Sequence, residues 1–332
     1  MQRYKGRRAV VLGCGLTGMS LARFLSGRGA TVRVADTRSA PPHAAALARE
    51  LPGVPLETGP ISASTFAGAD LISPGVAREQ TAIAAAVADG AELVGDIELF
   101  ARELPPGRRV LAITGTNGKS TVTALTGALT EAAGLPTTVA GNIGDAVLDV
   151  LARIEAGGSW PAVFVLELSS YQLETTASLK PAAATVLNVS ANHLDRYAGL
   201  VDYAAAKARI FTAADVQVLN RDDAVVRLMR RPGHTAQTFG AGVPMSEEEW
   251  GLVPRADGAW LARGGAGALV SALGAVLPSF VFIVLLSIAY FQWGQVPAVN
   301  KLFMGFIPAV TALIVSAAWN MGRKAVTGWR EG

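Results

Sequence analysis

A glycine-rich segment near the N-terminus has residue types that could bind a pyrophosphate. Residues Gly13–Gly18 read GCGLTG between an apolar run and a helical pattern, and Asp36 lies roughly 20 residues further on. The glycines let the backbone approach phosphate oxygens, and the positive end of the helix favours their negative charge. The motif predicts a nucleotide diphosphate without identifying the nucleotide, so an NAD-dependent oxidoreductase and a ligand-free turn stay open.

A second glycine-rich segment resembles a triphosphate-binding loop. It reads GTNGKST and consists of Gly115, Thr116, Asn117, Gly118, Lys119, Ser120 and Thr121. Backbone N–H groups can surround phosphate oxygens, Lys119 can reach the terminal phosphates, and the hydroxyl of Ser120 or Thr121 can hold Mg²⁺. The segment predicts a nucleoside triphosphate with Mg²⁺, and the alternative is a lysine-bearing turn without a nucleotide.

Three further residues could form a metal site beside this loop. Glu167 ends an apolar run in LELSS, His193 lies in NHLDRY, and Lys207 lies in the helical pattern AKAR. A carboxylate at a strand end next to a phosphate loop suits a hard cation such as Mg²⁺. A single histidine is more often structural than a ligand, so His193 alone does not decide the site.

Alternating strands and helices must position these residues. Strand-like runs cover 8–12, 31–35, 71–72, 110–114, 163–167, 184–188 and 216–220, and helical patterns cover 17–27, 80–89, 119–133 and 203–211. This alternation predicts an α/β fold with parallel, doubly wound sheets, and Pro105–Gly107 marks a domain boundary. Ligands bind at the carboxyl ends of such strands, where Thr114, Glu167 and Asn188 fall.

The composition separates the chain into two parts. Hydrophobic residues make up 51% and charged residues 17%, yet residues 264–300 contain no Asp, Glu, Lys or Arg. The net charge of +3 comes without a Lys/Arg run, which argues against a nucleic-acid partner. Cys14 is the single cysteine, so no internal disulfide can form and a reduced, cytoplasmic setting is predicted.

The C-terminal part has two apolar segments of membrane-spanning length, residues 269–291 and 302–319. Positive residues flank the pair, Arg263 before it and Arg323 and Lys324 after it. This pattern predicts a two-helix hairpin that inserts in the inner membrane with both ends cytoplasmic. A pair of buried core helices is the alternative.

Several motifs in order resemble the Mur ligase family, and specifically its MurD-type branch. They are GTNGKST, ELSSYQLE around Glu167, HLDRY from His193 and the helical Lys207, supported by GLTG at 15–18, DTR at 36–38, SPG at 73–75, GDIELF at 95–100 and GNIG at 141–144. The resemblance covers residues 5–262. It implies a Rossmann-like precursor-binding domain over 1–104 and a truncated central ATP-binding domain over 105–263, followed by the hydrophobic hairpin over 264–332.

The resemblance also implies ligands and a reaction. The UDP precursor would contact Leu16, Thr17, Asp36, Thr37, Arg38, Ser73, Gly75, Asn142 and His193, and ATP would lie on 115–121. Catalysis would use Lys119, Glu167, His193 and Lys207. Mg²⁺ would be held by Ser120, Glu167, His193 and a carbamylated Lys207. The implied activity is ATP-dependent addition of D-glutamate to UDP-N-acetylmuramoyl-L-alanine through an acyl phosphate, in peptidoglycan synthesis.

The chain departs from the family in two places. Asn192 stands where the family commonly has Asp before the metal-site histidine. From about residue 265 the chain instead resembles part of a chromate transporter, in GALVSALG at 267–274, LPSF at 277–280 and GFIPAV at 305–310. We therefore predict a hybrid that lacks the D-glutamate site and, alone, is inactive in forming the amide bond. The alternative is that the chain functions as a chimeric membrane protein that carries a chromate transporter fragment.

Overall fold

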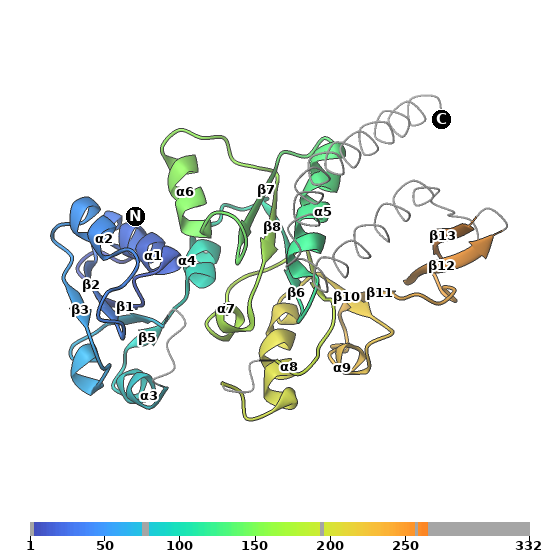
Figure 1. Ribbon diagram of the computed structural model, residues 1–332. Helices are drawn as coiled ribbons and strands as arrows, with labels where there is room; N and C mark the ends of the chain where they lie inside the picture. The colour runs from blue at the N-terminus through green and yellow to red at the C-terminus, as the bar shows by residue number, and fades with distance from the viewer. Residues whose placement is uncertain (1–2, 75–79, 193–195, 256–257, 265–332) are drawn as a thin grey trace, which may run out of the picture.

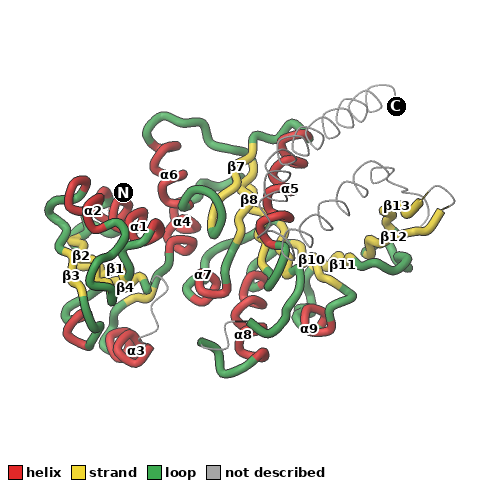
Figure 2. Tube along the Cα trace, viewed as in Figure 1, coloured by secondary structure: helices red, strands yellow, loops and turns green. Residues whose placement is uncertain are grey.

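Two sheets with helices around them make up the described part of the chain (Figure 1). The computed structural model describes residues 3–74, 80–192, 196–255 and 258–264. The first sheet belongs to the N-terminal part and the second to the part after Gly107. Figure 2 shows the helices in red around the yellow strands of each sheet.

The first sheet has five parallel strands in the order β3-β2-β1-β4-β5. Its strands are β1 (Arg8–Leu12), β2 (Thr31–Asp36), β3 (Leu56–Thr58), β4 (Leu71–Ser73) and β5 (Glu92–Leu93). Its helices are α1 (Leu16–Gly27), α2 (Ala44–Glu50), the 3₁₀ turn Ala63–Phe66 and α3 (Gln80–Ala88). β1 is buried after its first residue, as expected for a central parallel strand covered on both faces.

The second sheet has eight strands in the order β13-β12-β11-β10-β9-β6-β8-β7. Only β12 and β13 pair antiparallel. The strands are β6 (Arg109–Thr114), β7 (Thr137–Gly141), β8 (Val163–Glu167), β9 (Ala183–Val186), β10 (Val216–Asn220), β11 (Thr235–Phe239), β12 (Glu249–Arg255) and β13 (Gly258–Arg263). The helices are α4 (Asp96–Glu103), α5 (Lys119–Ala132), α6 (Val147–Glu155), α7 (Ser170–Glu174), α8 (Leu200–Ala208), the 3₁₀ turn Arg209–Phe211 and α9 (Ala224–Arg227).

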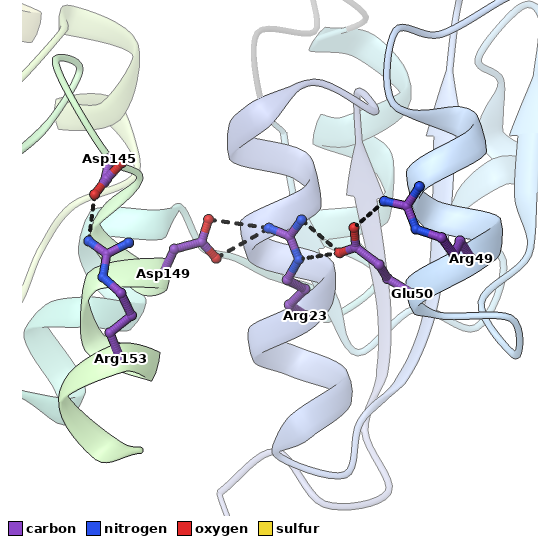
Figure 3. Close-up of polar contacts among 6 residues, drawn as sticks. All are labelled: Arg23, Arg49, Glu50, Asp145, Asp149 and Arg153. Atoms are coloured by element: carbon purple, nitrogen blue, oxygen red, sulfur yellow. Dashed lines mark hydrogen bonds and ion pairs between the residues drawn. The ribbon is translucent and has the colours of Figure 1, made fainter. Parts of the chain in front are cut away.

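Helix α6 joins the two parts, because it packs against α1 and α4. Figure 3 shows Arg23 of α1 between two carboxylates, Glu50 of α2 and Asp149 of α6. The shortest N–O distances are 2.8 Å to Glu50 and 3.2 Å to Asp149. Such half-exposed ion pairs add little stability. One cluster of buried apolar side chains includes Leu21 and Leu25 of α1 together with Leu148 and Val150 of α6. Apolar packing therefore joins the two parts, and the ion pairs add orientation.

The observed elements agree with most of the predicted runs. β8 and β10 have the predicted bounds, whereas β9 ends at Val186 and not at Asn188. The predicted helix over 203–211 begins earlier, at Leu200, and finishes as a 3₁₀ turn. The predicted boundary at Pro105–Gly107 lies in the loop between α4 and β6.

Some predictions fall on residues that the structure does not describe. The hairpin over 264–332 lies outside the described residues from 265 onward, as do Gly75 and His193. Within the described ranges, no helix has both the length and the apolar character to cross a membrane.

Candidate functional site

A cavity of about 310 Å³ is lined by residues of both parts of the chain. Its wall includes four of the residues expected to contact a precursor, Leu16, Thr17, Ser73 and Asn142. All four lie at the carboxyl ends of strands: Leu16 and Thr17 come after β1, Ser73 ends β4, and Asn142 follows β7. The Ser73 hydroxyl is buried and has no hydrogen-bond partner among the described residues, so it is available to a ligand.

Asp36, at the end of β2, supports the first glycine-rich turn. Its Oδ2 accepts a hydrogen bond from the Cys14 N–H at 2.7 Å, and its Oδ1 accepts one from the Arg38 N–H at 2.9 Å. The Arg38 guanidinium lies 2.6 Å from Oδ2 and holds the pKa of this carboxyl well below its usual range. Asp36, Thr37 and Arg38 do not belong to the described wall of the cavity, and the last two are exposed beside it.

The second glycine-rich segment links β6 to α5. Gly118 has φ +79°, a left-handed conformation that side chains disfavour, and it caps the N-terminus of α5. Lys119 donates to the Thr116 carbonyl at 3.1 Å, and Ser120 and Thr121 are exposed. The first N–H groups of a helix have no partner within it, so this turn presents donors and a lysine to an anion.

Glu167 ends β8 and is 2% exposed. Its Oε1 accepts a hydrogen bond from Asn142 Nδ2 at 2.8 Å, while its Oε2 is buried without a partner among the described residues. A buried carboxylate oxygen without a partner is costly and suits a cation ligand. Glu167 Oε2 is therefore a suitable ligand atom for Mg²⁺. In the described ranges, however, no three His, Cys, Asp or Glu side chains cluster as a complete metal site, and His193 lies outside those ranges.

Lys207 of α8 reaches the same end of the second sheet. Its side chain is 1% exposed, and Nζ donates to the Gly115 carbonyl at 2.9 Å and lies 4.5 Å from the centre of the Tyr203 ring. Burial, and then the positive charge of Lys119, lower the pKa of Lys207 to about 7. A substantial fraction of this lysine is therefore a neutral, nucleophilic amine near neutral pH, unlike an ordinary lysine.

The strand register brings these groups together. Ile113 of β6 pairs with Glu167 of β8, and the Thr114 hydroxyl donates to the Leu168 carbonyl at 2.6 Å. Glu167 and the phosphate-type turn therefore leave adjacent strands at the same edge. Asn142 connects this edge to the cavity, because it lines the cavity and donates to Glu167.

Sequence reasoning missed two polar pairs at the site. Gln172 Nε2 donates to Asp96 Oδ2 at 3.0 Å in the cavity wall, and burial raises the pKa of Asp96. Asn188 contacts the backbone of Asn117 in the second glycine-rich turn. The available signal was a polar residue beside an apolar run in each case, which does not reveal its partner.

Family models match both described parts of the chain. The N-terminal domain of MurD-like Mur ligases matches residues 7–95, and the Mur ligase middle domain matches residues 113–249. A chromate transporter model matches residues 232–331 and confirms the predicted resemblance of the C-terminal part to that family. This match overlaps the middle-domain match over residues 232–249.

Curated relatives agree with these matches. UDP-N-acetylmuramoylalanine--D-glutamate ligase of Nitrosomonas europaea is 49% identical over 271 residues, covering 79% of this chain and 58% of the relative. The protein of the same name from Thiobacillus denitrificans is 53% identical over 263 residues, covering 74% and 56%. The chain thus spans just over half the length of these relatives.

Solved structures are more distant. UDP-N-acetylmuramate-alanine ligase MurC from Thermotoga maritima is 21% identical with a TM-score of 0.44, covering 88% of this chain and 66% of that one. UDP-N-acetylmuramate:L-alanyl-gamma-D-glutamyl-meso-diaminopimelate ligase from Neisseria meningitides is 18% identical with a TM-score of 0.49, covering 78% of this chain and 84% of that one.

The two Mur ligase models and the sequence relatives replace the oxidoreductase alternative that the first glycine-rich turn left open. They also fit the two parallel-sheet units that the structure describes. Residues 7–95 and 113–249 match the N-terminal and middle domains of Mur ligases, and the sequence relatives, at about 50% identity, are ligases of the MurD type.

Proposed function

We propose that this chain binds UDP-N-acetylmuramoyl-L-alanine and ATP and activates the alanine carboxylate as an acyl phosphate. The observation that supports this most directly is the position of Asn142. It lines the cavity between the two sheets and donates to Glu167, which leaves the strand next to the phosphate-type turn. A substrate held in the cavity can thus reach a phosphoryl group held on the turn.

The precursor would occupy the cavity with its UDP end toward the first sheet. Leu16, Thr17 and Ser73 belong to the described wall, and the unpartnered Ser73 hydroxyl suits a phosphate or sugar oxygen. Asp36, whose acceptors already hold the Gly-rich turn and Arg38, would shape the uridine end with Thr37 and Arg38. Gly75 and His193 complete the proposed precursor contacts and lie outside the described residues.

ATP would lie on 115–121, with Lys119 neutralising charge that develops on the transferred phosphoryl group. Glu167, Ser120, His193 and Lys207 are the proposed Mg²⁺ ligands. Bound Mg²⁺ would neutralise phosphate charge. A bare ammonium on Lys207 would repel that cation, whereas a carbamate offers it an anionic oxygen. The neutral amine favoured by the pKa of Lys207, about 7, is the form that can be carbamylated.

In the complete reaction the amine of D-glutamate attacks the acyl phosphate and forms an amide. D-glutamate as the second substrate follows from the names of the relatives. We further propose the division into 1–104, 105–263 and 264–332. The first two parts would be cytoplasmic, and the third would attach the chain to the inner membrane.

Calorimetry with the purified chain tests precursor binding first. Heat on adding UDP-N-acetylmuramoyl-L-alanine supports the proposal, and its absence contradicts the cavity assignment. ADP release that requires the precursor then tests activation, and an amide product that requires D-glutamate tests complete ligation. Lys119→Ala should abolish ADP release, while the matched change of the exposed Lys180, Lys180→Ala, should leave it unchanged.

A further inference from the structure

Asn188, which follows β9, contacts the second glycine-rich turn with its side chain. Its Oδ1 accepts a hydrogen bond from the Asn117 N–H at 2.9 Å, and its Nδ2 donates to the Asn117 carbonyl at 3.0 Å. One side-chain amide thus satisfies both backbone groups of one residue in the turn. This two-sided contact has the form that a neighbouring strand's peptide group would make.

The contact extends the strand pairing beyond the sheet. The Leu187 N–H donates to the Thr114 carbonyl at 2.9 Å, and the Thr116 N–H donates to the Asn188 carbonyl at 2.9 Å. At Asn117 the backbone of the turn has left the sheet, and its hydrogen bonds are made to the Asn188 side chain instead. A Cβ on Gly115 would lie 3.1 Å from the Leu187 Cβ, so a glycine there permits the close approach.

Because both backbone groups of Asn117 are engaged, the orientation of the turn is fixed before any ligand arrives. The following residue, Gly118, is left-handed and starts α5, a helix of 14 residues. Donors on this helix start can converge on phosphate oxygens only if the preceding peptides hold one orientation. A donor set that is already oriented binds without an ordering cost.

We propose that Asn188 is a positioning residue for the triphosphate of ATP. It acts through the Asn117 backbone and does not touch the nucleotide. This inference rests on the proposed nucleotide site at 115–121 and adds a residue outside that segment.

The test measures MgATP affinity of the full chain by calorimetry for wild type, Asn188→Ala and Asn188→Asp. Asn188→Ala removes both hydrogen bonds and should weaken MgATP binding about tenfold. Asn188→Asp keeps the acceptor but sets a carboxylate oxygen against the Asn117 carbonyl and adds negative charge near the phosphates. It should therefore weaken binding more than Asn188→Ala does.

Two readouts separate positioning from a general loss of structure. Inorganic triphosphate with Mg²⁺ should show the same fold-loss as MgATP, while affinity for UDP-N-acetylmuramoyl-L-alanine should change by less than about twofold. Asn220→Ala is the matched control, because Asn220 Nδ2 donates to the Leu187 carbonyl at 2.8 Å. It removes a comparable bond near Asn188 without touching the turn, so Tm should fall and MgATP affinity should not.

The outcomes are distinct. Wild-type MgATP affinity in both Asn188 variants overturns the positioning role and leaves the nucleotide site standing. Equal losses for MgATP and for the UDP precursor also overturn it, since the effect would then be a general one. No MgATP binding by the wild-type chain overturns the proposed nucleotide site and the role of Asn188 together.

Discussion

Lys207 provides the most direct test of the site, because its chemistry depends on its charge. Its amine is almost fully buried among the Gly115 carbonyl, the Tyr203 ring and α8, and its pKa is about 7. At about pH 8 an amine with this pKa is about 90% neutral, whereas an ordinary lysine is about 0.3% neutral. The fold therefore raises the reactive form of this lysine about 300-fold.

We expect Lys207 to form a carbamate with carbon dioxide, visible as a carbonyl signal in ¹³C NMR with ¹³CO₂. Lowering the pH from about 8 to about 6 at fixed dissolved CO₂ reduces the neutral fraction of Lys207 about tenfold. Carbamate formation also releases a proton, so the signal should fall by more than that factor.

Lys207→Arg is the control, since it keeps a long cationic side chain but offers no amine of this kind. The signal should be absent in that variant. A signal that persists in Lys207→Arg, or no signal from wild type at about pH 8, would refute the assignment of a neutral amine to this position.

Three further changes test other contacts, each by urea unfolding. Asn142→Ala leaves both carboxylate oxygens of Glu167 without a protein partner, so the free energy of unfolding should fall by about 1–3 kcal/mol; an unchanged value would contradict the contact. Asp36→Ala should cost about 1–3 kcal/mol at neutral pH. The difference in unfolding free energy between Asp36→Ala and wild type should shrink in acid. The pKa of Asp36 is lowered in the folded state, so the stability that its carboxylate provides is present at neutral pH and is lost as the pH falls through that pKa. Gly18→Ala places a Cβ 1.8 Å from a backbone carbonyl oxygen and should destabilise by about 1–3 kcal/mol or more, whereas Gly27→Ala meets open space and should stabilise by about 0.4–1 kcal/mol.

The sequence predicts the buried strands better than the edges. β8 is buried at all of its positions, so its apolar run has the bounds of the strand. β7 is an edge strand in TTVAG with only one buried residue, and its pattern gave no strand. Beyond the end of β9, the Leu187 N–H donates to Thr114 of β6 and the Asn188 carbonyl accepts from the Thr116 N–H, so backbone pairing continues past the strand. That pairing depends on a segment about 70 residues away in the chain, which no local pattern contains.

The same limit applies to the site. Motif spacing and the family resemblance predict the turn at 115–121, Glu167 and Lys207 as site residues, and the structure places all three at one edge of the second sheet. The roles of Asn188, Asp96 and Gln172 come from contacts across the fold. Local periodicity predicts which residues are buried. It does not predict which polar atom of a distant residue will form hydrogen bonds with their buried polar groups.

The cavity is bordered by the carboxyl ends of strands from both sheets. Ser73 ends β4 in one sheet, and Asn142 and Ser169 follow β7 and β8 in the other, so carboxyl ends from both sheets face one space. Helix α6 fixes that arrangement by packing on α1 and α4. Asn142 then serves two purposes at once, since it forms part of the cavity wall and orients Glu167. A ligand that reorients Asn142 would change the environment of Glu167, so the proposed precursor binding would be coupled through this amide to the charge beside the phosphate-type turn.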